Sequence, residues 1–128
     1  MTYYFSKTIA QPFEAAVAAT RAALSEEGFG VITEIDVQQT LKTKIGEAFR
    51  PYLILGACNP HLAFEALQLE DKVGVMLPCN VIVQAVQGDR TEVAAVDPVA
   101  SMQAINNPVL KAKASLVGEK LRAVLDRL

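Results

Sequence analysis

Apolar residues in the first part of the chain change between a strand-like and a helix-like spacing. Residues 3–9 alternate loosely and include three aromatic side chains, which is typical of a β-strand. From Phe13 to Leu24 apolar residues recur every three or four positions, and Gly28 supplies a left-handed end, so a helix is predicted there. Residues 31–35 predict a second strand.

Capping residues and prolines indicate where the other helices begin. Asp36 and Gln39 form a capping box that predicts a short helix ending near Ile45. A favoured N-cap residue followed by proline occurs three times, as Asn59-Pro60, Asp97-Pro98 and Asn107-Pro108. We therefore expect helices over 60–69, for one or two turns after position 97, and from 108 to the C-terminus. The apolar stripe of the last helix fits packing on a sheet, with a coiled-coil seam as the alternative.

The middle of the chain predicts three more strands. Residues 52–58 form one apolar run, and residues 73–86 form another that is broken at Pro78, which has no donor for a regular ladder. Gly88-Asp89 fits a two-residue hairpin turn, which would pair residues 81–86 with residues 91–96. The pattern predicts an α+β fold with an antiparallel-rich sheet and two long helices on one of its faces.

The predicted hairpin is largely apolar on both faces. One face would hold Val81 and Val83 with Ala94, and the other would hold Ile82 with Val93. The long helices can cover only one side of the sheet. The simplest way to bury the other side is against a second copy of the chain, so a homodimer is predicted. The alternative is that the short helices and loops are a sufficient cover.

Composition limits the classes of protein to which this chain can belong. A chain of 128 residues with 52% hydrophobic and 20% charged residues fits one folded domain over residues 1–128. The net charge is −2 and the basic residues form no stripe, so no nucleic-acid site is predicted. No signal peptide or run of ~20 apolar residues is evident, so we expect no membrane partner and a cytoplasmic location. Thiols in that compartment are normally reduced.

Two Cys-Asn dipeptides, Cys58-Asn59 and Cys79-Asn80, are the main candidates for chemistry. If the strand over residues 52–58 and the strand that starts at residue 73 are antiparallel neighbours, the two cysteines are offset by roughly 15 Å, beyond the ~7 Å limit for a disulfide. With His61 they could supply three ligands to a soft metal, but the spacing has little specificity. We expect no metal site and no cofactor, and a redox or metal-binding protein is the less favoured interpretation.

The predicted hairpin register places Asn80 opposite Asp97. A pocket at the strand ends could then gather Cys58, Asn59, Cys79, Asn80 and Asp97 around a small polar or thiol-dependent ligand. The alternative is that Asn59 and Asp97 act only as helix N-caps, in a non-catalytic structural or interaction module. A single histidine without a positioned nucleophile gives no catalytic signature, so an enzyme is less favoured.

Several segments resemble the domain-of-unknown-function 302 family over essentially the whole chain. These segments are Tyr3-Tyr4-Phe5, Glu26 to Val31, Glu34 to Val37, Arg50 to Pro60, Met76 to Val81 and Val96 to Val99. The resemblance implies a β-α-β(4)-α fold, grouped with TATA-binding-protein-like sheets by architecture only. Members of this family with crystal structures are generally small bacterial or archaeal proteins that tend to dimerise, so the resemblance implies a dimer. It implies no established reaction. A likeness in fold to a DNA-binding protein is no evidence of DNA binding.

Overall fold

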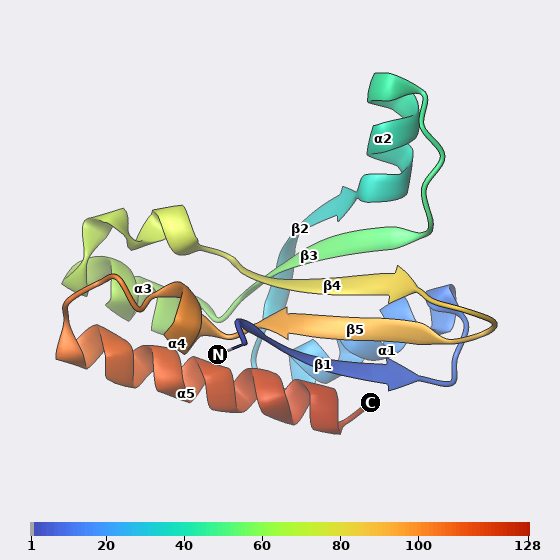
Figure 1. The fold of residues 1–128 in the computed structure, drawn as a ribbon. Coiled ribbons are helices and arrows are strands. Elements are labelled where there is room, and N and C mark those ends of the chain that lie inside the picture. The colour runs from blue at the N-terminus through green and yellow to red at the C-terminus, as the bar shows by residue number, and fades with distance from the viewer. Residues whose placement is uncertain (1) are drawn as a thin grey trace.

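The computed structural model describes residues 2–128, so of the domain expected over residues 1–128 only Met1 lies outside the description. Strands and helices follow one another in the β-α-β(4)-α order, with short helices between the strands (Figure 1). The elements are β1 (Tyr4–Ile9), α1 (Phe13–Glu26), β2 (Gly30–Asp36), α2 (Val37–Ile45), β3 (Tyr52–Cys58), α3 (Pro60–Leu69), the 3₁₀ helix η1 (Asp71–Met76), β4 (Cys79–Ala85), β5 (Thr91–Val96), α4 (Pro98–Ser101) and α5 (Pro108–Asp126).

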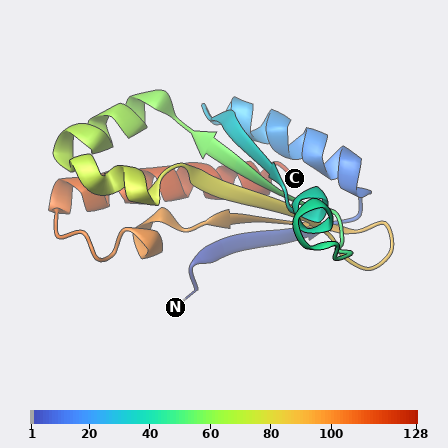
Figure 2. The same cartoon turned by 90° about the horizontal axis from the view of Figure 1, so that it is seen from above.

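The five strands form one antiparallel sheet in the order β1-β5-β4-β3-β2. The long helices α1 and α5 lie together on one side of this sheet, as the view from above shows (Figure 2). We call this side the covered face and the other side the open face. The predicted fold class, an α+β fold with two long helices on one face, is confirmed.

The core lies between the covered face and the two long helices. Alternate residues of the central strands point into it, and Val81, Val83 and Val93 are fully buried there. They pack with Leu24 of α1 and Leu121 of α5, which are also fully buried. The apolar stripe of α5 is therefore a core-packing surface, as predicted, and not a coiled-coil seam.

The N-caps identified in the sequence begin the helices where expected. Asn59 Oδ1 accepts a hydrogen bond from the Leu62 amide at 3.2 Å, and Asp36 accepts one from the Gln39 amide at 2.9 Å. Asn107 Oδ1 accepts from two amides at the start of α5. These bonds satisfy amide groups that the first turn of a helix leaves without partners. The predicted short helix after Asp36 ends at Gly46, which has a left-handed conformation with φ of +71°.

The strand predicted over residues 73–86 is shorter than expected. Residues 73–76 belong instead to the 3₁₀ helix η1 (Asp71–Met76), and β4 begins only at Cys79. Val73 is buried with Ala66 and Leu110 in a second apolar cluster away from the sheet, so its hydrophobic character serves helix packing instead of a ladder. A short apolar run does not distinguish these two uses.

The hairpin between β4 and β5 is confirmed, but its loop is one residue longer than predicted. The Val86 amide donates a hydrogen bond to the carbonyl of Arg90 at 3.0 Å, so residues 87–89 form a three-residue loop. Gly88 lies inside this loop and has a left-handed conformation with φ of +70°. The pairing of the two strands is therefore shifted by one residue from the predicted register.

The shift changes which side chains of β5 face the helices. Val81 pairs with Ala95, where the predicted register would have paired it with Val96. Because side chains alternate along a strand, the same shift moves Val93 to the covered face and Ala94 to the open face beside Ile82. Both faces of the hairpin still carry mostly apolar side chains, but the members on β5 are exchanged, and Glu92 moves to the open face beside Gln84.

Helix α2 extends away from the rest of the molecule beyond the β2 edge of the sheet (Figure 1). None of its nine residues is buried. Its apolar side chains Val37, Leu41 and Ile45 follow at four-residue intervals and thus share one side of the helix, and Ile45 is 65% exposed. The element is amphipathic, yet its own chain covers little of its apolar side.

Candidate functional site

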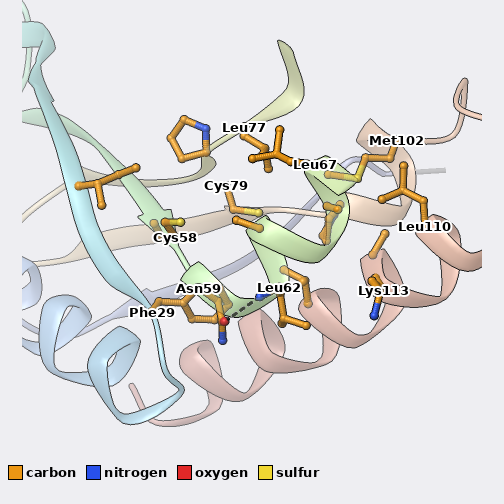
Figure 3. A pocket seen from close by; sticks show the side chains of 18 residues that line it. Phe29, Cys58, Asn59, Leu62, Leu67, Leu77, Cys79, Met102, Leu110 and Lys113 are labelled. Carbon is orange, nitrogen blue, oxygen red and sulfur yellow. Dashed lines mark hydrogen bonds between the residues drawn. The ribbon is translucent and has the colours of Figure 1, made fainter. Parts of the chain in front are cut away.

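A cavity of about 280 Å³ opens at the end of the sheet where β3 finishes and β4 begins (Figure 3). We call it the end cavity. Side chains reach it from β2, from the ends of β3 and β4, and from α3, α4 and α5. The residues that line it are Phe29, Ile32, Ala57, Cys58, Asn59, Leu62, Ala63, Ala66, Leu67, Leu77, Pro78, Cys79, Pro98, Met102, Leu110, Lys113, Ala114 and Val117.

The walls of the end cavity are almost entirely apolar. Among the 18 described residues that line it, Asn59 and Lys113 are the only ones with polar side chains other than thiols. Its volume is about twice the ~150 Å³ of an engineered apolar cavity that holds benzene in another protein. Such a space suits a small apolar molecule better than the polar ligand expected from the sequence.

A β-bulge shapes the β2 side of this cavity. The register between β2 and β3 shifts between Val31 and Thr33, which leaves Ile32 as the extra residue. Ile32 lines the cavity and is 61% exposed, so it lies where the cavity meets solvent. The bulge therefore places the large apolar side chain of Ile32 at the rim of the cavity. A regular strand would direct this side chain elsewhere.

The two cysteines lie at the same end of the sheet, and the predicted offset of roughly 15 Å between them is wrong. Ala57 pairs with Cys79, so Cys58 is only one residue away from the position opposite Cys79. The error arose because η1 takes up the residues before Pro78, and β4 starts at Cys79 itself. Both cysteines are free thiols in the structure and both line the end cavity (Figure 3).

The Cys79 thiol is protonated at neutral pH. Cys79 is 8% exposed, and its pKa is raised from 9.0 to about 11. Burial of the thiol is the larger cause, and the nearby Cys58 is the smaller one. Since the thiolate is the form that attacks electrophiles and binds metals, Cys79 contributes a neutral, polarisable wall to the cavity. The geometry therefore does not favour a ligand held through the thiolate of Cys79.

The predicted polar cluster is divided between different parts of the molecule. Cys58, Asn59 and Cys79 line the end cavity, whereas Asn80 is exposed on the open face, because neighbours in a strand point to opposite sides. The expected pairing of Asn80 with Asp97 is wrong by one residue, because the hairpin register is shifted. Asp97 caps α4, accepting a hydrogen bond from the Val99 amide at 3.0 Å.

A second hollow, of about 400 Å³, crosses the open face, and we call it the sheet-face groove. Tyr4 and Tyr52 contribute aromatic walls, and Ile82 lies in the floor between them. A polar ladder also crosses this face: Arg50 donates to Gln84 Oε1 at 2.8 Å, and the Gln84 amide donates to Glu92 Oε1 at 2.7 Å. The open face is thus mixed in character, which the predicted register did not anticipate.

Metal-binding geometry is not present in the part of the chain from residue 2 to residue 128. No group of three or more His, Cys, Asp or Glu side chains there is placed to hold an ion. His61 is exposed in the first turn of α3, after the Asn59 cap. The structure also gives no helix within these residues that has the length and apolar character needed to cross a bilayer.

Sequence reasoning identified three residues of the end cavity and missed most of its wall. Leu62 of α3, Met102 after α4, and Leu110 and Lys113 of α5 approach one another only after the chain folds. One signal was visible in α5, where Lys113 lies three residues after Leu110 and four before Val117, in the apolar stripe of the helix. A lysine in such a stripe can bury its methylene groups against apolar neighbours while its ammonium group stays in water.

These features define a small antiparallel α+β domain with an apolar cavity at one end of its sheet. The chain matches the family described as "Domain of unknown function DUF302" over residues 5–128, and it belongs to that family. A solved structure of similar fold, "Crystal structure of uncharacterized conserved protein DUF302 from Bacillus stearothermophilus", is 28% identical, with a TM-score of 0.92. The match covers 99% of this chain and 98% of the other. No curated protein matches the chain.

Proposed function

We propose that this protein is a homodimeric binding domain whose end cavity takes up a small, largely apolar molecule. The observation that supports this proposal is a cavity of about 280 Å³ with almost only apolar walls, open to solvent beside Ile32. Pockets for small molecules in proteins are mostly apolar, with a few polar groups that orient the ligand. Asn59 and Lys113 are the polar groups here.

The Cys-Asn motifs have different roles in this proposal. Cys58 and Cys79 form part of the wall, and Asn59 fixes the start of α3, which supplies Leu62 and Ala63 to the same wall. A hydrophobic ligand would gain roughly 25 cal/mol for each Å² of apolar surface that it buries. Asn80 and Asp97, which the sequence grouped with these residues, lie outside this cavity in the proposal.

A cavity-filling substitution tests ligand uptake. Ala63 lines the cavity and is half-buried, so Ala63→Leu should fill part of the space and weaken binding of 1-octanol, measured by calorimetry, at least tenfold. Ala112→Leu, the same change at an exposed position of α5, should leave the affinity unchanged. Bound octanol should also slow alkylation of Cys58. Failure of octanol to bind the wild type, or equal binding to both variants, would count against the proposal.

The homodimer would form through the open face and α2. The sheet face is roughly 24 Å wide and 20 Å long from ordinary strand spacings. With α2 added, this surface approaches the ~800 Å² per partner of a typical stable interface. A helix of nine residues with none of them buried is marginal in water, so α2 gains most from a partner that covers Leu41 and Ile45.

A second copy of the chain would cover the open face and the apolar side of α2 at the same time. In a two-fold arrangement each copy would place its α2 against the other's open face, which satisfies the exposed apolar residues of both elements. Light scattering at micromolar concentration should give twice the 13.8 kDa chain mass. Ile82→Lys, in the floor of the sheet-face groove, should give the monomer, whereas Leu116→Lys on the outer side of α5 should remain dimeric. A wild-type monomer would refute the dimer and leave ligand binding to be judged by the octanol experiment.

A further inference from the structure

The end cavity has one charged residue in its wall, Lys113 of α5. On that helix it shares the cavity-facing side with Leu110, Ala114 and Val117, which lie three or four residues from one another. A lysine in such a stripe places its methylene groups along the apolar wall and its ammonium group at the border with water. Figure 3 shows Lys113 on α5 at the edge of the cavity.

A carboxylate already lies beside this ammonium group. Glu65 of α3 accepts a hydrogen bond from Lys113 Nζ, so the pair joins α3 to α5 at the rim. Glu65 itself is exposed and is not part of the cavity wall. An ammonium group has three donors, and Glu65 uses one of them. Lys113 can therefore donate to a second carboxylate without losing the first.

None of the described residues in the cavity wall carries a negative charge that would oppose such a group. Lys113 is the only Lys, Arg, Asp or Glu among the described residues that line the cavity. Burial raises the pKa of Cys79 to about 11, which keeps this deep sulfur neutral at pH 7. A ligand with an apolar part inside the cavity would contact the apolar wall. An anionic group of the same ligand at the rim would lie beside the ammonium group of Lys113.

We propose that the natural ligand of the end cavity is an apolar monocarboxylate, with its hydrocarbon part between α3 and the strand ends and its carboxylate on Lys113. This inference rests on the proposed function, because it names the ligand class of the same cavity. The volume of about 280 Å³ fits a chain or ring of about the size of a short fatty acid or an aromatic acid.

Octanoate and 1-octanol are matched probes, because they share a chain and differ in the charged group. By calorimetry at pH 7 and low salt, wild-type protein should bind octanoate roughly threefold to tenfold more tightly than octanol, as one partly exposed ion pair allows. Lys113→Met keeps the apolar stem and should abolish this preference. Lys111→Met, an exposed lysine of the same helix, should leave the preference unchanged.

Glu65→Gln supplies the opposite test. It removes the charge that competes for Lys113, so octanoate should bind more tightly than to the wild type, while octanol should bind as before. Equal affinities of the wild type for the two probes, or an unchanged preference in Lys113→Met, would overturn the carboxylate inference and leave apolar binding intact. Failure of both probes to bind would overturn the proposed function as well. Circular dichroism of each variant verifies that it is folded.

Discussion

Gly56 in β3 is a position where a side chain would collide with two neighbours. A Cβ atom there would lie 2.0 Å from Thr33 Oγ1 and 2.8 Å from Pro78 Cγ. Rotation of its side chain can turn the exposed Thr33 hydroxyl away, but the ring of Pro78, which directly precedes β4, has no such freedom. The glycine thus permits close contact between β2 and the start of β4 beside the end cavity.

We predict that Gly56→Ala lowers the free energy of unfolding by roughly 1–3 kcal/mol, the usual cost of overpacking. Gly118→Ala is the matched control, because its new Cβ would lie 3.7 Å from Pro98, an ordinary contact. Since Gly118 is inside α5, the control should be neutral or up to about 1 kcal/mol more stable. Urea unfolding measures both changes. Equal effects of the two substitutions would contradict this account of Gly56.

Cys79 should make the folded state sensitive to alkali. Its thiol ionises near pH 9.0 when unfolded and near pH 11 when folded, so its contribution to stability is intact below pH 9 and declines as pH rises to 11. The expected loss is about 2–3 kcal/mol. Unfolding measured from pH 8 to 11 should show a smaller decline for Cys79→Ala than for the wild type. Cys58→Ala, at the half-buried thiol, should resemble the wild type more closely. Parallel pH profiles for wild type and Cys79→Ala would refute this prediction.

At the scale of the elements, α5 packs beside α1 on the covered face of the sheet, and its two sides should differ sharply in their response to truncation. Leu121 is fully buried against the core, whereas Leu116 is exposed on the outer side. Leu121→Ala should cost about 2–5 kcal/mol, and Leu116→Ala should cost less than about 1 kcal/mol. Chemical unfolding compares them directly. Similar losses at the two positions would mean that the outer side of α5 is also packed.

Element boundaries were predictable wherever a local signal fixes the backbone. The Asn107 and Asn59 caps act through hydrogen bonds within one turn, so the sequence alone locates the starts of α5 and α3. The register of the hairpin was not fixed in this way. Gly88 tolerates a left-handed conformation in a loop of two or three residues, and the choice depends on which side chains the helices cover.

The candidate site was predictable only in its sequence-local part. The ends of β3 and β4 place Cys58 and Cys79 at one edge, and the motifs indicated this region. Met102 and Lys113 join the same wall through long-range packing, for which a single sequence contains no direct signal. The split between Cys79 and Asn80 follows from strand alternation, but it required knowing that β4 begins at residue 79.

At the scale of the whole molecule, α2 should be ordered mainly by assembly. If a partner covers its apolar side, amide hydrogen exchange in α2 should be slow at high protein concentration and should accelerate on dilution. In Ile82→Lys these amides should exchange rapidly at every concentration, while those of β4 and β5 stay protected. Mass spectrometry of exchanged peptides measures this. Concentration-independent protection of α2 would indicate that its own chain is sufficient to hold it.

The pairing of β1 with β5 has a consequence for synthesis of the protein. Tyr4 pairs with Val96, so the first strand can enter the sheet only after almost the entire remainder of the sheet has been made. At ~5–20 residues per second, a ribosome takes roughly five to twenty seconds to translate the intervening segment. Throughout that interval the aromatic strand β1 has no strand partner, so protection of this segment by a chaperone would matter most then.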